Sequence, residues 1–134
     1  RRGGRRRGGA GGEGVTGPAV LRLVFDPGAG GCLWAGDAAT RDSYGYGPLD
    51  AAVFALSGQV LTPPAVPLTG TIRDLRDDLL RDHLTALDLD DPGGPGLWFP
   101  DQHRAFAARV AQFCGLLQAE LGPGFVILND QDRA

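Results

Sequence analysis

Residues 101–121 carry a hydrophobic pattern that fits an α-helix with one buried side. Apolar residues recur there at spacings of three and four, which places them on one stripe of a helix. The stripe consists of Phe106, Val110, Phe113, Cys114, Leu117 and Leu121. Asp101 lies at the start, just after Pro100, and Gly122 followed by Pro123 ends the helix. We expect this helix to pack on one face of a small sheet.

The strands of that sheet are indicated at both ends of the chain. Residues 19–26 alternate, with Leu21, Leu23 and Phe25 on one face, which is typical of a strand with one side on a core. The five residues 27–31 break this strand, and residues 32–35 predict a second one, so 19–35 forms a hairpin. The continuous apolar run at 125–128 predicts a buried strand.

Two further helices are predicted between these strands. Asp37 is a suitable N-cap for a short helix over 38–44, which Gly45 ends. A longer helix starts at Thr69 or Thr71, where Thr71 and Asp74 approximate a capping box. Its apolar stripe comprises Ile72, Leu75, Leu79, Leu80, His83, Leu84 and Leu87. Its charged face comprises Arg73, Asp74, Arg76, Asp77, Asp78, Arg81 and Asp82.

The remaining connections are predicted to be irregular. Residues 51–56 fit either a helical turn or a strand, and the prolines at 63, 64 and 67 exclude regular structure beyond them. The Pro- and Gly-rich segment 88–100 must be a loop. The predicted fold is α+β, with a small, mainly antiparallel sheet made of the N-terminal hairpin and the C-terminal strand. The two main helices pack on one face of it.

Charge divides the chain into a short basic tail and an acidic body. Residues 1–14 carry five Arg and one Glu, a net +4, whereas the remainder carries −7. We expect an Arg/Gly-rich disordered tail over 1–17 and one domain over 18–134. The acidic body does not favour nucleic acid or anionic membrane as a partner, although the tail could contact RNA. No apolar run is long enough to span a membrane, and we expect a cytoplasmic protein.

The residue types exclude several kinds of chemistry. There is no Lys, so Schiff-base, pyridoxal-phosphate and phosphate-loop lysines are excluded. Residues 88–94 resemble a calcium loop at positions one, three and six, but Pro92 and Phe99 stand at positions five and twelve. His83, His103, Cys32 and Cys114 lack metal-ligand spacing. We therefore expect no metal or cofactor. The cysteines are expected to be reduced and buried, with a Cys32–Cys114 bridge as the alternative.

Loop-edge aromatic residues indicate a possible binding surface. Trp34, Tyr46, Trp98 and Phe99 border predicted loops, where such side chains either form interfaces or close the end of a core. Together with the acidic loop residues Asp88, Asp90 and Asp91, they are the candidate binding residues. The junction between the loop and the last helix, at Trp98 and Phe99, is the first place to look for a functional surface.

Three stretches together resemble a family of small actinobacterial proteins to which no activity is assigned. They are Cys32-Leu33-Trp34 with Asp37 and Tyr44-Gly45-Tyr46, then 67–98, then 105–123. In that family the middle block more often reads Asp-Thr-Ser-Leu-Asn-Trp, whereas Leu84 and Leu89 replace its first and last residues here. The resemblance implies a cytoplasmic protein of actinobacterial type and implies no activity.

Three hypotheses about function remain open at this stage. The first is a small protein-binding or regulatory module, which fits the acidic body, the loop aromatics and the lack of a catalytic pattern. The second is a small enzyme that uses Asp88, Asp90 and Asp91 with His83 or His103, and it requires these groups to share one pocket. The third is RNA contact through the tail. We expect a binding module rather than an enzyme.

Overall fold

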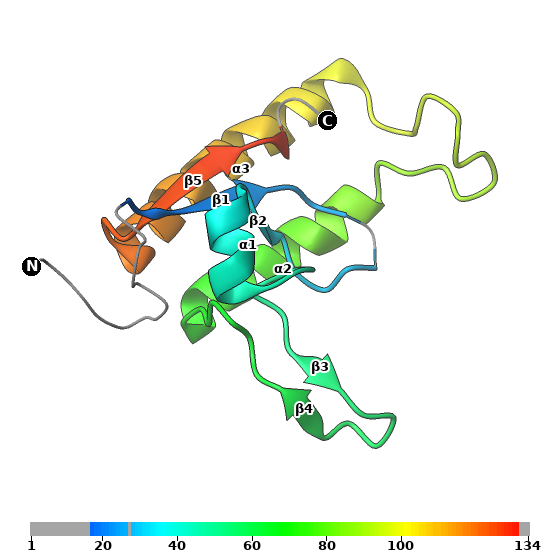
Figure 1. The fold of residues 1–134 in the computed structure, drawn as a ribbon. Helices are drawn as coiled ribbons and strands as arrows, with labels where there is room; N and C mark the ends of the chain where they lie inside the picture. Colours follow the sequence, from blue (N-terminus) through cyan, green and yellow to red (C-terminus); the bar gives the residue numbers. More distant parts are fainter. Residues whose placement is uncertain (1–16, 27, 132–134) are drawn as a thin grey trace, which may run out of the picture.

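The computed structural model of this chain describes residues 17–26 and 28–131. The predicted tail, and with it the RNA hypothesis, falls almost entirely outside the described residues. The elements in chain order are β1 (Ala19–Leu23), β2 (Leu33–Ala35), α1 (Ala38–Tyr44), β3 (Val53–Phe54), β4 (Val60–Thr62), α2 (Gly70–Leu84), α3 (Pro100–Leu121) and β5 (Phe125–Asn129). The fold is α+β, as predicted (Figure 1).

The main sheet has three strands in the order β2-β1-β5. Strand β1 pairs antiparallel with β2, which confirms the N-terminal hairpin, and parallel with β5. The register places Leu21 opposite Ala35 on one side and Ile127 on the other. Because side chains alternate between the faces of a strand, Leu21 and Leu23 point to one face and Arg22 to the other.

The hydrophobic core lies between this sheet and the two long helices, which are drawn behind the sheet in Figure 1. Leu21 and Leu23 of β1 and Leu33 of β2 are fully buried in it. Helix α3 contributes Phe106, Val110, Phe113 and Leu117, and α2 contributes Ile72 and Leu79. No helix among the described residues is long and apolar enough to cross a membrane.

Helix α3 confirms the predicted stripe and extends one residue further at its start. Its first residue is Pro100, whose missing N–H is no loss at this position. The Phe99 N–H donates to Gln102 Oε1 at 2.8 Å, so a side chain of the first turn closes the helix start. At the other end Gly122 adopts a φ of 79° and its N–H donates to the Gln118 carbonyl.

Helix α2 confirms one of its two predicted starts and differs from the prediction at its other end. Thr69 is its N-cap and Gly70 its first residue, so the capping box proposed at Thr71 does not form. Thr69 instead turns toward α3, and its N–H and hydroxyl donate to the Glu120 carboxylate at 3.0 and 2.5 Å. The helix ends at Leu84, so the predicted stripe position Leu87 lies in the following loop.

Arg76 is the largest departure from the predicted helix faces. The sequence pattern places it among exposed charges, but its side chain is buried and forms an ion pair with the buried Asp50 at 3.2 Å. The guanidinium also donates to the Asp50 carbonyl at 2.7 Å and pairs with Asp77. A charge is buried only when a partner satisfies it, and the partner lies 26 positions away, out of reach of any local pattern.

Asp50 ties β2 to this ion pair. Its carboxylate accepts the backbone N–H groups of Cys32 and Leu33 at about 3 Å. A Cβ at Gly31 would lie 2.6 Å from Asp50 Oδ1, which requires glycine there. Burial, reinforced by the Asp50 charge, raises the pKa of the Cys32 thiol well above its ordinary value. Cys32 therefore has a buried, unreactive free thiol, as the sequence predicts, and does not form the alternative bridge.

The segment 51–56, which fits either a helical turn or a strand by sequence, contains the first strand of a second hairpin. Strands β3 and β4 pair antiparallel with each other, with a turn at Gly58, where φ is 91°. This hairpin, residues 53–62, projects away from the sheet and helices (Figure 1), and we refer to it as the arm. Every residue of both strands is exposed.

The C-terminal strand is less buried than predicted. Phe125 and Ile127 pack against the core, but Val126 and Leu128 are 38% and 43% exposed. The continuous apolar run therefore belongs to an edge strand with one apolar face outward.

Helix α1 confirms its prediction, because Asp37 Oδ1 accepts the Thr40 N–H at 2.8 Å and Gly45 ends the helix.

Candidate functional site

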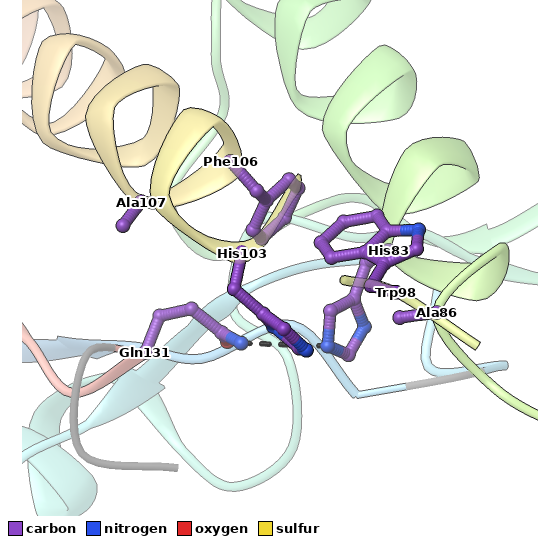
Figure 2. A pocket seen from close by; sticks show the side chains of 7 residues that line it. All are labelled: His83, Ala86, Trp98, His103, Phe106, Ala107 and Gln131. Atoms are coloured by element: carbon purple, nitrogen blue, oxygen red, sulfur yellow. Dashed lines mark hydrogen bonds between the residues drawn. The ribbon is translucent and has the colours of Figure 1, made fainter. Parts of the chain in front are cut away.

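A pocket of about 430 Å³ opens where the end of α2, the start of α3 and the residues after β5 meet. It is lined by His83, Ala86, Trp98, His103, Phe106, Ala107 and Gln131. Figure 2 shows the two imidazoles and the Gln131 amide pointing into the same space, with the Trp98 and Phe106 rings beside them. This volume falls in the range of known small-ligand pockets.

Trp98 is held in place from the loop that joins α2 and α3. Its indole N–H donates to Thr85 Oγ1 at 2.9 Å, and the Thr85 hydroxyl donates to the Asp82 carbonyl. One residue earlier, the Leu97 N–H donates to the Ala86 carbonyl at 2.8 Å. Gly96 has a φ of 85°, and a Cβ there would lie 2.7 Å from the same carbonyl oxygen. These hydrogen bonds hold the two ends of the long loop together at its base and fix the position of the Trp98 indole in the pocket wall.

The walls of the pocket are aromatic rings in mutual contact. Trp98 lies 5.1 Å from Phe106 and 5.4 Å from His103, measured between ring centroids. His83 stacks on Phe106 at 5.6 Å and also contacts Phe25, the residue that follows the end of β1 by two positions. Rings packed in this way form a rigid apolar wall that favours a planar guest.

His83 is the partly buried titratable group of this wall. Burial lowers its pKa from the ordinary value of 6.5, the Asp26 carboxylate opposes this shift, and the neighbouring His103 adds to it. The ring is therefore neutral at pH 7. A neutral imidazole has one donor and one acceptor nitrogen, and its neighbours decide which is which.

Gln131 determines which nitrogen of His83 is the acceptor. Its Oε1 accepts the Phe25 N–H at 2.8 Å, which fixes the orientation of the amide. The amide nitrogen then faces His83 Nε2 at 3.4 Å (Figure 2). Because an amide nitrogen only donates, Nε2 is the acceptor and the proton of His83 sits on Nδ1. The polar corner of the pocket therefore offers one acceptor, His83 Nε2, beside one donor, the Gln131 amide.

The described residues that line the pocket include no carboxylate, hydroxyl or thiol, and its titratable groups are the imidazoles of His83 and His103. Among the described residues no group of three or more His, Cys, Asp or Glu side chains is placed to hold a metal ion. What the pocket presents is a ring-lined cavity with a small polar corner.

The structure brings together some of the predicted site residues at this pocket. Trp98, His83 and His103 line it. Phe99 is adjacent in sequence and 74% exposed, so it lies at the surface beside the pocket. The predicted functional junction between the loop and α3 is thus the place where the pocket forms.

The acidic loop lies apart from the pocket. Asp90 and Asp91 are exposed and Asp88 is partly exposed. Asp88 Oδ1 accepts the Asp90 N–H at 3.0 Å, a local turn contact of the kind that Asp commonly makes in loops. None of the three carboxylates lines the pocket that the two histidines share.

Two predicted aromatic residues lie elsewhere. Trp34 is on β2 opposite Arg22, and its indole N–H donates to the Val24 carbonyl at 3.0 Å. Tyr46 is 84% exposed just after α1, with the Arg41 guanidinium 5.8 Å from its ring centroid. Neither lines the pocket, so the predicted aromatic set divides between separate surfaces.

Two features were missed from the sequence. Gln131 lies near the chain end and 48 positions from His83, and no pattern connects them. The arm had a usable signal, because no residue from 51 to 72 is charged, although an uncharged stretch alone also fits a buried element.

Comparison with known proteins adds no family to this description. No model of a known protein family matches the sequence, and a search of curated proteins gives no significant match.

Proposed function

We propose that this chain is a protein-binding module whose pocket receives an aromatic side chain of a partner protein. The observation that supports this most directly is the pocket itself, a cavity of about 430 Å³ with ring walls and a polar corner. Binding interfaces are dominated by a few aromatic anchors that fill such cavities.

The surroundings of the pocket favour a protein over a free small molecule. Leu97 and Phe99 flank Trp98 in sequence and are 56% and 74% exposed. Exposed large apolar side chains next to a pocket residue are typical of a protein interface, where they exclude water around the central anchor.

The polar corner favours tyrosine as the anchor. A phenol hydroxyl both donates and accepts a hydrogen bond. His83 Nε2 supplies the acceptor and the Gln131 amide supplies the donor, and the two lie 3.4 Å apart. A Tyr ring against the wall formed by Trp98 and Phe106 could place its hydroxyl between the two groups and bond to both. A Phe ring has no polar atom for this corner, so the direct His83–Gln131 contact would remain, and the one net hydrogen bond that a Tyr hydroxyl gains by inserting between the two groups would be missing.

The first test is an NMR titration of the full chain with p-cresol, the side-chain analogue of Tyr, and with toluene, the analogue of Phe. We expect saturable shifts at the Ala86 and Ala107 methyl groups. We expect p-cresol to bind roughly tenfold more tightly than toluene, as one net hydrogen bond predicts. Non-saturable shifts spread over the surface, or equal affinity for the two probes, would contradict the proposal.

Two variants provide a matched comparison. Trp98→Ala removes one wall and should abolish saturable binding, whereas Tyr46→Ala removes an exposed aromatic side chain outside the pocket and should leave binding unchanged. A peptide library displayed on phage then tests the protein partner. Peptides selected on the wild-type chain should share a Tyr, and they should not be enriched on Trp98→Ala.

A further inference from the structure

The arm and a second groove on the same chain form a pair of unfilled apolar surfaces. The exposed apolar side chains of the arm are Val53, Phe54, Leu56, Val60 and Leu61. The groove, of about 220 Å³, is lined by Leu75, Leu79, Arg109, Gln112, Phe113 and Leu116 from α2 and α3. It shares no lining residue with the candidate site.

The arm is unusual for a surface element. An isolated two-stranded hairpin is marginally stable in water, and its exposed apolar side chains are normally covered. Phe54 is 60% exposed, and Leu56 near the tip is completely exposed. No charged residue occurs between 51 and 72, so the arm also lacks the charges that usually protect an exposed strand edge from pairing.

The groove can accept such side chains. Leu79 and Phe113 are buried at its floor, whereas Leu75 and Leu116 are 36% and 42% exposed at its walls. An apolar cavity of about 150 Å³ accommodates a benzene ring, so one Phe or Leu fits. At the rim Arg109 forms an ion pair with Asp82, so an uncharged arm would bury no unpaired charge there.

We propose that two copies of this chain form a symmetric dimer in which the arm of each copy inserts Phe54 into the α2–α3 groove of the other and lays its remaining apolar side chains, Leu56 among them, over the exposed rim of that groove. The arm points away from its own body in Figure 1, which leaves the groove of another molecule as its target. Residues 15–134 carry a net charge of −7, so two copies repel each other except where uncharged surfaces meet.

The area supports reciprocal insertion. Burying one Val, Leu or Phe side chain removes roughly 100 Å² of apolar surface, so one arm supplies roughly 500 Å². One arm in one groove then buries roughly 1,000 Å² over both surfaces, at the low end for a stable interface, whereas two reciprocal contacts bury roughly 2,000 Å². A twofold axis produces both contacts at once.

The test is sedimentation equilibrium of the full chain over a range of concentrations. We expect wild type to reach twice the monomer mass of 14.0 kDa at roughly 50 µM, since interfaces of this size bind at micromolar or lower concentrations. Leu56→Asp on the arm and Leu116→Asp in the groove should each raise the dimer dissociation constant at least about 100-fold. Val126→Asp, on an exposed apolar face outside both surfaces, should leave it unchanged.

Mixing the two defective variants gives the decisive result. Leu56→Asp keeps a complete groove and Leu116→Asp keeps a complete arm, so the mixture should form a heterodimer through one intact contact. Far-UV circular dichroism checks that each variant is folded. If Leu56→Asp or Leu116→Asp does not fold, Leu56→Ser or Leu116→Ser takes its place. A wild-type chain that stays monomeric at 50 µM, or that needs a different protein to cover the arm, overturns the proposal, as does a mixture without heterodimer. Trp98→Ala should dimerise normally, which separates this proposal from the pocket.

Discussion

Both hairpins of this chain are rich in apolar residues, but their surroundings are opposite. In the first, β1 lies between β2 and β5, and Leu21 and Leu23 are fully buried. In the second, β3 and β4 pair with each other, and every residue of both strands is exposed. A hairpin gains stability from the layers packed against it, so the first belongs to the core. The apolar side chains of the second hairpin are exposed to solvent, and the dimer proposed above would cover them.

Asp50 and Arg76 join the first hairpin to α2, and Asp50→Ala has the largest expected effect. The substitution leaves the buried Arg76 without its main partner and the Cys32 and Leu33 N–H groups without their acceptor. Removing one member of a buried pair costs about 3–5 kcal/mol. Urea denaturation measures this free energy.

The matched control is Asp82→Ala, which removes the surface pair with Arg109 and should cost less than about 1 kcal/mol. Equal losses for the two variants would mean that the Asp50 pair does not anchor the first hairpin to α2.

Leu23→Ala and Leu61→Ala make the comparison between the hairpins direct. Leu23 is fully buried in β1, so its truncation should lower the free energy of unfolding by about 2–5 kcal/mol. Leu61 is 61% exposed in β4, and its truncation should change the free energy by less than about 0.5 kcal/mol at concentrations where the chain is monomeric. A large loss at Leu61 would show that the arm packs on its own body.

The same contrast explains what the sequence predicts well. The β1–β2 hairpin and α3 have one buried face each, and burial enforces a period of two or of three to four residues. Leu21, Leu23 and the α3 stripe are therefore predictable from spacing alone. The arm has no buried face, so residues 51–56 show no period and fit a helical turn as well as a strand.

The sequence does not predict the polar contacts between residues that are far apart in the chain. Arg76 is buried because Asp50 satisfies it, and His83 is oriented by Gln131, which Phe25 holds in turn. Each partner comes from a different element, and only the packed chain brings them together. The sequence indicates Trp98 and Phe99 as a functional junction, but it contains no signal that separates Trp98 in the pocket wall from Trp34 on the sheet.

Gly28 and Gly58 test whether the arm is coupled to the core. Both have positive φ, 80° and 91°, and a Cβ at either would meet open space. Alanine at such a position costs roughly 1–2 kcal/mol through backbone strain alone. Gly28→Ala lies in the loop of the buried hairpin and should lower the melting temperature.

Gly58→Ala should instead speed hydrogen exchange of the arm amides, such as the Ala55 N–H that donates to the Gln59 carbonyl, and leave the melting temperature unchanged. Equal losses of melting temperature for the two variants would show that the arm unfolds together with the core.

Acidification should loosen the pocket side of the molecule and leave the arm unchanged, and this is the smallest effect. The folded-state pKa of His83 is lowered, chiefly by burial, so the unfolded chain takes up a proton at a higher pH than the folded chain. The stability contribution is complete above the ordinary value of 6.5, declines as the pH falls through 6.5, and levels off below the folded pKa. His103 and Asp26 act on the same ring in opposite directions, and the ring is only partly buried, so solvent weakens the effect.

Urea denaturation of wild type and His83→Gln between pH 7.5 and about 5 isolates the contribution of His83 to the free energy of unfolding. The difference between the two curves should shrink toward acid pH, His103→Gln should retain most of the wild-type dependence, and the arm amide shifts should not move. A parallel decline of both curves would assign the acid response to other groups.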